Sequence, residues 1–410
     1  MKVLWISNIL FDDIADVVGV NRSTGGGWMQ SLLTLVKTQI KIGVVALHSK
    51  TFSQEIKGVS YYLLSSINKN DWKNVLDDFK PDLIHIHGTE YPHTYKIKQY
   101  CGNIPCIVSI QGLVSVYSRY ALGGMHSKEI FRFTTLKDVL LHSSPWSIQR
   151  SQKKRGMYEK QLIANINYII GRTKWDYAHA LTMNPSIKYY YCSEVIRDTF
   201  YQGTWHYQNA VSHTIFCSNS SVPLKGIHQV VKALFIVKRL YPDVKVRIAG
   251  KNILGHLSVK DRLRLSGYDN YLRNLIYRLG LEDAITFLGT LSAEEMKTEF
   301  LRANVFILPS SIENSPNSLA EAQLLGVPII ASYAGGIPDM MPSPLSDYIY
   351  RFEEVEMLAQ RIMEIFQQRE WDKYTNIVKD IAHKRHNRKI IRNNLISIYV
   401  DVLETFNETL

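Results

Sequence analysis

The chain is predicted to be an α/β protein built from two doubly wound parallel sheets. Short apolar runs alternate with helical patterns along the whole sequence, which is typical of parallel strands joined by crossover helices. The runs form two series of comparable size, the first beginning at Val3–Ser7 and the second at Thr214–Cys217. We therefore expect two domains with a ligand in the cleft at the carboxyl ends of the strands.

In the first series the expected strands are Val3–Ser7, Gly43–Leu47, Leu83–His87, Cys106–Ile110, Tyr168–Ile170 and Tyr189–Cys192. In the second they are Thr214–Cys217, Val244–Ala249, Ile285–Leu288, Val305–Leu308, Pro328–Ala331 and Tyr348–Tyr350. Helical patterns lie between most of them, for example at Trp28–Lys37, Gly226–Arg239 and Glu294–Leu301. The strand signal lapses between 201 and 212, so we predict domains over 1–205 and 206–387. A final helix within 388–410 is expected to pack back on the first domain.

Bulk properties favour a globular protein of more than one domain. The chain has 410 residues, 46% of them hydrophobic and 21% charged, and no apolar run approaches the roughly 20 residues that span a bilayer. The N-terminus reads as a first strand, because Asp12 and Asp13 soon follow it and no cleavage site for a signal peptide is present. Four scattered cysteines without zinc-like spacing favour a reduced, cytoplasmic setting.

The net charge of +11 is partly local. The segment from Met125 to Lys160 contains eight Lys and Arg residues but only three acidic residues, and apolar and aromatic residues lie between them. One interpretation is a solvated helix pair over a core. The other is a basic amphipathic surface that rests on anionic lipid or grips a phosphate-bearing acceptor. No recognised nucleic-acid module accompanies the charge, so nucleic acid is not an expected partner.

The segment Val305–Pro328 is the most informative part of the chain. Val305–Pro309 is apolar, as in a buried parallel strand, and Ser315 and Pro316 suit the N-cap and first position of a helix that stops at Gly326. The helix N-terminus, with free N–H groups near Asn317 and Ser318, would therefore lie at the carboxyl end of a strand. A phosphate binds at such a position in an open α/β sheet.

Two acids belong to the same segment, Glu313 in the loop and Glu321 in the helix. Carboxylates repel a phosphate but accept hydrogen bonds from hydroxyl groups. Amides that bind an anion beside acids that bind hydroxyls suit a sugar nucleotide.

Other candidate residues follow other strands. Glycines 25–27 precede a helix, where a plain flexible loop is the alternative to a ligand-binding turn. Lys225 starts a helix after a strand and could neutralise a diphosphate leaving group, or be a solvated surface lysine. His87 ends the strand D-L-I-H-I-H and Glu90 follows it, and contact of either with the acceptor is the functional hypothesis. His85 is expected to be a core or rim histidine. The next strand ends near Gln111. The chain lacks D-x-D, H-E-x-x-H and G-x-S-x-G motifs, which disfavours bound Mg²⁺, zinc hydrolysis and serine acyl transfer.

These motifs together resemble the retaining glycosyltransferases of family 4. The strongest likeness is E-N-S-P-N-S-L-A-E-A-Q-L-L-G-V-P, similar to the E-x₇-E signature of that family. S-T-G-G-G, D-L-I-H-I-H-G, P-L-K-G-I, V-R-I-A-G, I-T-F-L-G and A-G-G-I-P-D follow the family's order across nearly the whole chain. The resemblance implies the GT-B architecture, with two facing Rossmann-like domains, the first for the acceptor and the second for the nucleotide sugar.

The resemblance also implies roles. Glu313 would contact donor-sugar hydroxyls, the amides near Asn317 and Ser318 would meet sugar and phosphate, and Glu321 would hold the ribose. Members of the family generally work without a metal or other cofactor, so none is expected here.

In the same resemblance, Lys225 and the backbone of Gly26 and Gly27 would stabilise the diphosphate. Residues around Gly250 and Phe287–Leu288 would flank the base.

Two residues depart from the family pattern. Gln111 stands where a histidine is common, and Asn219 stands where a basic residue is usual. Arg172 is a candidate for the missing positive charge. These departures keep open a catalytically inactive sugar-nucleotide sensor or a basic membrane-associated scaffold, and an epimerase or phosphorylase is the rival among enzymes.

The predicted reaction is transfer of a hexose, from a UDP-sugar rather than a GDP-sugar, to an acceptor hydroxyl with retention of configuration. The acceptor could be a polyprenyl-diphosphate sugar at the inner membrane face, as in bacterial surface-polysaccharide assembly, or a soluble oligosaccharide.

Overall fold

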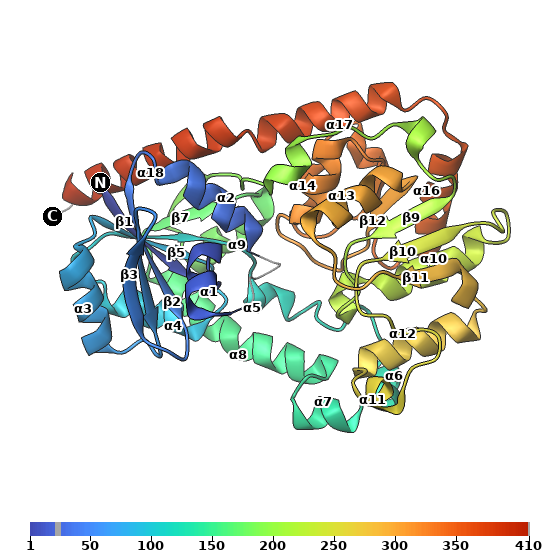
Figure 1. The fold of residues 1–410 in the computed structure, drawn as a ribbon, viewed down its shortest axis with the longest axis horizontal. Coiled ribbons are helices and arrows are strands. Elements are labelled where there is room, and N and C mark those ends of the chain that lie inside the picture. The colour runs from blue at the N-terminus through green and yellow to red at the C-terminus, as the bar shows by residue number, and fades with distance from the viewer. Residues whose placement is uncertain (21–25, 409–410) are drawn as a thin grey trace. The chain divides into compact units, whose positions relative to one another are not determined.

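The computed structural model describes residues 1–20 and 26–408 and divides into two compact units. Unit 1 comprises Met1–Ser115, Lys154–Arg197 and Arg385–Leu410, and unit 2 comprises Val116–Lys153 and Asp198–Lys384. Each unit contains one sheet with helices packed against it (Figure 1).

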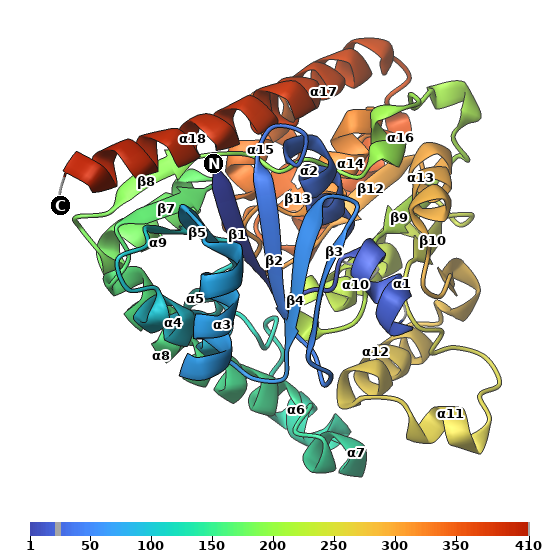
Figure 2. The same cartoon turned by 60° about the vertical axis from the view of Figure 1, so that its left-hand side comes forward.

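The sheet of unit 1 has eight strands in the order β3-β4-β2-β1-β5-β6-β7-β8 (Figure 2). Their bounds are β1 Lys2–Ser7, β2 Lys41–Leu47, β3 Phe52–Ile56, β4 Val59–Leu64, β5 Leu83–His87, β6 Cys106–Ser109, β7 Tyr168–Gly171 and β8 Lys188–Tyr191. Every neighbouring pair is parallel except β3 with β4. The helices that begin before residue 116 are α1 Asp12–Val18, α2 Gly27–Val36, α3 Lys69–Phe79, α4 Pro92–Tyr100 and α5 Val114–Tyr117. Later ones are α8 Pro145–Ala164, α9 Lys174–Met183 and α18 Arg388–Glu408.

The sheet of unit 2 has six parallel strands in the order β11-β10-β9-β12-β13-β14. Their bounds are β9 Thr214–Cys217, β10 Lys245–Ile248, β11 Ile285–Phe287, β12 Val305–Leu308, β13 Ile329–Ser332 and β14 Ile349–Tyr350. The helices are α6 Ser127–Phe133, α7 Leu136–Leu140, α10 Ile227–Val237, α11 Val259–Leu263, α12 Gly267–Arg278, α13 Ala293–Arg302, α14 Asn317–Leu325, α15 Ile337–Met340, α16 Val355–Gln367 and α17 Asp372–Arg385. Short 3₁₀ turns are η1 Asp198–Tyr201, η2 Tyr207–Asn209, η3 Pro223–Lys225, η4 Glu282–Ala284 and η5 Leu345–Tyr348.

Both sheets reverse their strand order once, and open α/β sheets bind their ligands at such reversals. In unit 2 the reversal lies between β9 and β12, and in unit 1 it lies between β1 and β5. The loops that leave two such strands separate in opposite directions and open a crevice at the carboxyl edge. Lys225 and Glu313 follow β9 and β12, while His87 ends β5, so the predicted residues lie at these two points.

The strand prediction found every strand except β3 and β4. These two form an antiparallel hairpin whose turn residues, Lys57 and Gly58, have φ of 51° and 80°. β3 is mostly exposed at the sheet edge, so its sequence F-S-Q-E-I carries no apolar run of the kind that identified the other strands.

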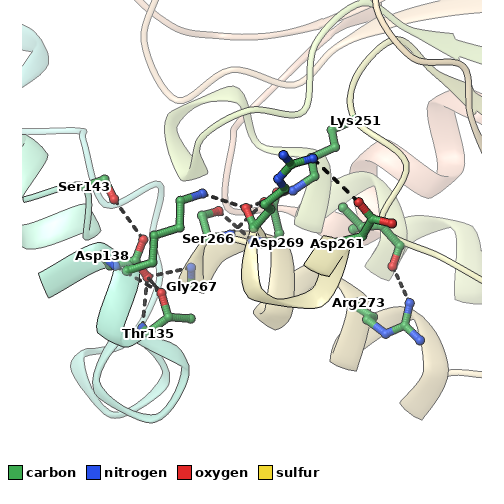
Figure 3. A network of polar contacts seen from close by, with 12 residues as sticks. Thr135, Asp138, Ser143, Lys251, Asp261, Ser266, Gly267, Asp269 and Arg273 are labelled. Carbon is green, nitrogen blue, oxygen red and sulfur yellow. Dashed lines mark hydrogen bonds and ion pairs between the residues drawn. The ribbon is translucent and has the colours of Figure 1, made fainter. Parts of the chain in front are cut away.

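The segment Val116–Lys153 corrects the predicted domain division. It lies within the expected first domain of 1–205, yet its contacts group it with unit 2. Met125 and Ile130 of this segment are buried with Tyr268 and Tyr271 of α12. The buried Asp138 carboxylate also accepts hydrogen bonds from Thr135, Ser143 and the backbone of Gly267 at the start of α12 (Figure 3). Lys137 Nζ also donates to the Arg264 carbonyl at 2.6 Å. Losing a buried carboxylate that accepts several hydrogen bonds is costly, because its donors would be left buried without an acceptor.

The C-terminal helix α18 completes the core of unit 1. Its Ile391, Leu395, Ile398, Tyr399 and Val402 are buried with residues of β1 and α2. Trp5 Nε1 donates a hydrogen bond to the Tyr399 hydroxyl at 3.1 Å, which joins the first strand to the last helix.

Candidate active site

An ion pair occupies the reversal point of unit 2. Lys225 Nζ lies 2.6 Å from Glu313 Oε1, which also accepts a hydrogen bond of 2.7 Å from Ser310 Oγ. The Lys225 side chain is 28% exposed and that of Glu313 is 9% exposed. Among the described residues both bonds of the Glu313 carboxylate end on Oε1, so Oε2 can accept from a ligand hydroxyl.

Two glycines allow the loops around this pair to touch. Gly226 has φ of +71°, and a Cβ there would lie 1.8 Å from the Pro309 carbonyl oxygen. Gly335 has φ of +56°, and a Cβ there would lie 1.8 Å from the carbonyl oxygen of Glu313. A side chain at either position would push apart the loops that carry the ion pair.

Helix α14 begins one residue later than predicted. Pro316 rather than Ser315 is the N-cap, and no side chain caps the helix. Ser315 Oγ instead contacts Met340 Sδ at 3.7 Å. The first helical residues are Asn317 and Ser318, so their amides keep the orientation that suits an anion.

Glu321 lies inside α14 and is only 3% exposed. The same helix is buried from Leu319 to Leu325, between β12 and β13 in the sequence, and ends at Gly326 as predicted. This burial leaves little of the Glu321 carboxylate accessible to a ribose. The exposure of Glu321 therefore does not support its predicted role in holding the ribose.

The predicted base-binding residues follow β10 and β11. Gly250 and Gly289 form an antiparallel β-bridge, in which the backbone nitrogen of each lies 2.9 Å from the carbonyl oxygen of the other. Phe287 is buried and Leu288 is partly exposed beside this bridge. Asn219 turns inward on its own loop, since its Oδ1 accepts from Ser221 N and Oγ at 2.9 and 2.8 Å. Asn219 therefore shapes the loop after β9 and supplies no positive charge.

The second set of predicted residues lies in unit 1. His87 ends β5, is 4% exposed, and neither of its ring nitrogens has a hydrogen-bond partner in the part of the chain that the structure describes. Its ring lies 3.8 Å from that of His85, centroid to centroid. Burial and then the charge of Arg172 lower the pKa of His87 to about 3, so the ring is neutral at physiological pH.

His85 is a core residue, as predicted. Its Nδ1 lies 2.5 Å from the Tyr399 hydroxyl and its Nε2 lies 2.6 Å from Ser109 Oγ. A cavity of about 20 Å³, enough for one water, lies beside both histidines. Arg172 and Glu194 also line it.

The structure does not leave Arg172 free to face a diphosphate. Its guanidinium lies 2.6 Å from Glu194 Oε1, both side chains are about 5% exposed, and it stacks on the Trp28 ring at 5.4 Å. Sequence reasoning missed Glu194, because it follows an ordinary strand without any motif. The pair neutralises Arg172, so this residue does not replace the missing basic residue at Asn219.

Glu90 follows β5 by three residues and has an unusual carboxyl group. Burial raises its pKa to about 7, with a further upward contribution from Glu159. Oε2 has no hydrogen-bond partner in the described residues. The raised pKa favours the protonated carboxyl, which can donate a hydrogen bond to a ligand hydroxyl as well as accept one. Gln111, after β6, already has an interaction within the protein.

Of the three predicted glycines, Gly25 lies outside the described residues. Gly26 is the N-cap of α2 and Gly27 its first residue, with no side-chain cap. A Cβ on Gly26 would lie 2.3 Å from Ile9 Cδ1, and one on Gly27 would lie 2.9 Å from Arg197 Cδ. Both neighbouring atoms belong to flexible side chains, so these contacts alone do not require glycine at either position.

Within residues 1–20 and 26–408, no group of three or more His, Cys, Asp and Glu side chains could hold a metal ion. The four cysteines are free and buried. None of the helices in the described ranges is long and apolar enough to cross a bilayer.

Comparison with solved structures defines the fold class. Sucrose-phosphate synthase from Thermosynechococcus elongatus superposes with a TM-score of 0.72 over 99% of this chain and 100% of that one, at 14% identity. Anabaena Alr3699/HepE in complex with UDP-glucose gives 0.66 over the full length of both chains, at 15% identity. The chain has the GT-B fold of these glycosyltransferases.

Residues 208–384 match the family model "Glycosyl transferases group 1". The putative colanic acid biosynthesis glycosyltransferase WcaL of Escherichia coli K12 is 27% identical over 183 residues, 42% of this chain and 41% of that protein. The D-inositol 3-phosphate glycosyltransferase of Pseudarthrobacter chlorophenolicus is 32% identical over 114 residues, 28% of this chain and 25% of that protein. The matched region thus spans less than half the length of these relatives.

Proposed function

We propose that this protein is a retaining glycosyltransferase that moves a hexose from a nucleotide diphosphate sugar, preferably a UDP-sugar, to an acceptor hydroxyl in glycoconjugate biosynthesis. The observation that carries the proposal is the Lys225–Glu313 pair at the strand-order reversal of unit 2. It places a cation and a hydroxyl-binding acid side by side where this fold binds ligands.

The proposed donor site follows the strand order. The base lies near Gly250 and Leu288, after β10 and β11, and the diphosphate meets Lys225 and the first amides of α14. Glu313 accepts hydrogen bonds from the sugar hydroxyls through Oε2. Lys225 and the helix amides balance the charge of the leaving diphosphate, so the reaction needs no metal or other cofactor.

In the proposed reaction the bond from the sugar C1 to the diphosphate oxygen breaks through an oxocarbenium-like state. The acceptor oxygen attacks C1 from the face that the diphosphate leaves, and its proton passes to the departing phosphate oxygen. Configuration at C1 is therefore retained. Positioning and leaving-group electrostatics supply most of the rate.

The acceptor we propose is lipid-linked, at the inner face of an anionic membrane. Its support is the α6–α7 surface, which we define as the five exposed apolar residues Phe131, Leu136, Val139, Leu140 and Leu141. Lys128 and Arg132 are exposed among them. Large exposed apolar side chains among cations suit the interface of an anionic bilayer.

The test is a thermal-shift screen of the purified protein against UDP- and GDP-sugars, followed by product analysis with saccharide and polyprenyl-diphosphate-sugar acceptors. We expect one UDP-sugar to raise the melting temperature, because ligand binding stabilises the folded state. Transfer should then require an acceptor. Conversion of the donor without an acceptor would indicate an epimerase, and binding without turnover on every acceptor would indicate a sensor.

A further inference from the structure

A cavity of about 490 Å³ lies at the carboxyl edge of the sheet in unit 2. Three residues that follow successive strands line it: Ser311 after β12, Tyr333 after β13 and Arg351 after β14. Its volume is within the range of pockets that hold small molecules. None of the residues predicted from the sequence lines this cavity.

The other wall of the cavity is formed by the segment Val116–Lys153, which belongs to unit 2 although it lies in the first half of the sequence. Arg119, Tyr120 and Gly123 belong to this wall. Ser311 Oγ donates to the Tyr120 carbonyl at 3.1 Å, and His228 Nε2 donates to the Gly123 carbonyl at 2.9 Å. Gly123 has φ of +56°, and a Cβ there would lie 2.2 Å from the Pro223 carbonyl oxygen. The wall is therefore fixed by specific contacts and needs glycine at its closest approach.

The lining combines two cations, an acid and three aromatic rings, those of Tyr120, Tyr333 and Phe352. Arg119 and Arg351 supply the guanidinium groups, and Glu353 supplies a carboxylate. The Arg351 side chain is 74% exposed and its Nη1 lies 3.9 Å from Glu354 Oε1, so most of its donors are accessible to a ligand. Tyr120 and Tyr333 are 43% and 67% exposed. Guanidinium groups bind carboxylates and phosphates, while a tyrosine offers an apolar ring face and a hydroxyl to a sugar.

The strand order places the cavity relative to the reaction. The base is proposed to lie over β10 and β11, and Lys225 and Glu313 lie in the loops after β9 and β12. The cavity lies over β12, β13 and β14, on the other side of the ion pair from the base. Ser311 joins the two regions, because its N–H donates to the Leu224 carbonyl at 2.8 Å, next to Lys225.

We propose that this cavity binds an acidic sugar residue of the acceptor, a pyranose that carries a carboxylate or a phosphate. The guanidinium groups of Arg119 and Arg351 hold the anion, Glu353 accepts from a ring hydroxyl, and Tyr333 packs on the ring. The inference rests on the proposed function only for the identity of the ligand as acceptor. The binding of an acidic sugar to the cavity is testable without turnover.

The experiment titrates the full chain by ligand-observed NMR with three probes: methyl glucuronide, glucose 6-phosphate and the neutral methyl glucoside. We expect at least one acidic probe to bind about tenfold more tightly than the glucoside, because charge-assisted hydrogen bonds exceed neutral ones. The comparison of the two acidic probes identifies the anion. The double variant Arg119→Gln/Arg351→Gln should lose this preference, whereas Arg239→Gln, an exposed arginine of the same unit outside the cavity, should keep it.

Equal binding of acidic and neutral probes, or a preference that survives in the double variant, would overturn the inference. Binding of UDP-sugars by thermal shift is measured on the same samples. A protein that binds UDP-sugars but shows no acidic preference refutes the cavity assignment and leaves the proposed function standing. An acidic preference without any nucleotide-sugar binding refutes the proposed function and leaves the cavity as an acidic-sugar site.

Discussion

Lys225 and Glu313, 88 residues apart in the sequence, form an ion pair of 2.6 Å between Nζ and Oε1. The pair joins the loops that follow β9 and β12, the two strands at which the sheet order reverses. Each side chain thus holds the other in place before any ligand arrives. Such preorganisation reduces the cost of orienting charged groups around a reacting diphosphate sugar.

Replacing either member of the pair should remove transfer and keep the fold. We expect Lys225→Ala and Glu313→Ala each to lower kcat/KM at least about 100-fold, the size of effect seen when one group that stabilises developing charge is lost. Steady-state kinetics with a UDP-sugar would measure it. Lys238→Ala changes a partly exposed lysine at the end of α10, whose Nζ donates to the Gly280 carbonyl; it is the matched control and should retain full activity. Near-normal turnover of either site variant would refute these roles.

The fold was largely predictable from the sequence because buried parallel strands are short apolar runs. Val305–Leu308 and Thr214–Cys217 are buried throughout and were found with their observed bounds. β3 was missed because an exposed edge strand needs no apolar run. The order of the strands, which creates the reversal points, depends on pairing between distant segments and left no local signal.

The site was predictable only in part, for a similar reason. Glu313 and Lys225 were found because each follows a strand within a recognisable motif. The partner of Arg172 could not be predicted, because Glu194 lies 22 residues later and carries no motif of its own. The association of Val116–Lys153 with unit 2 likewise depends on contacts between distant segments, such as the buried Asp138 carboxylate with the Gly267 backbone, which no local pattern predicts.

The Arg172–Glu194 pair should stabilise unit 1 and behave as a coupled unit. Arg172→Met leaves the buried Glu194 carboxylate without its partner and should lower the free energy of unfolding by about 3–5 kcal/mol. Glu194→Leu should also be costly, while the double variant Arg172→Met/Glu194→Leu should cost less than the sum of the single changes. Urea unfolding of the four proteins measures the coupling. Additive single effects would show that the two groups do not depend on each other.

The stability of unit 1 should depend on the ionisation of Glu90. Its pKa is about 7 in the folded protein, raised mainly by burial from its ordinary 4.5, so the folded state holds an extra proton between these pH values. The contribution of Glu90 to the free energy of unfolding is therefore fully present below pH 4.5 and is lost as the pH rises to 7. The loss is at most about 3 kcal/mol.

Glu90→Gln removes this proton-binding site, so its unfolding free energy should fall less between pH 5 and 7 than that of the unchanged protein. Denaturant titrations across that range measure the difference. Glu55→Gln, in the mostly exposed edge strand β3, should leave the pH profile unchanged. Parallel pH profiles for Glu90→Gln and the unchanged protein would show that the Glu90 carboxyl titrates normally.

Asp138 should hold α7 and its neighbouring loops against α12. Asp138→Ala removes hydrogen bonds to Thr135, Ser143 and Gly267 and should cost about 3 kcal/mol locally. Hydrogen exchange should rise within residues 127–144 and at the start of α12. Asp261→Ala, which removes a half-exposed acid in the first turn of α11 that accepts from Ser258 Oγ, is the control and should leave residues 127–144 protected. Unchanged exchange in Asp138→Ala would refute the anchoring role.

The α6–α7 surface should bind anionic membranes. Vesicles of phosphatidylglycerol should co-sediment the protein, phosphatidylcholine vesicles should not, and salt should weaken the binding, because Lys128 and Arg132 act through charge while the apolar side chains enter the interface. Leu136→Glu/Leu140→Glu should lower vesicle affinity at least about tenfold, since it removes apolar burial and adds repulsion. Leu240→Glu changes a leucine that is 70% exposed elsewhere in unit 2 and should bind normally. Equal losses in both variants would mean that this surface has no special part in membrane binding.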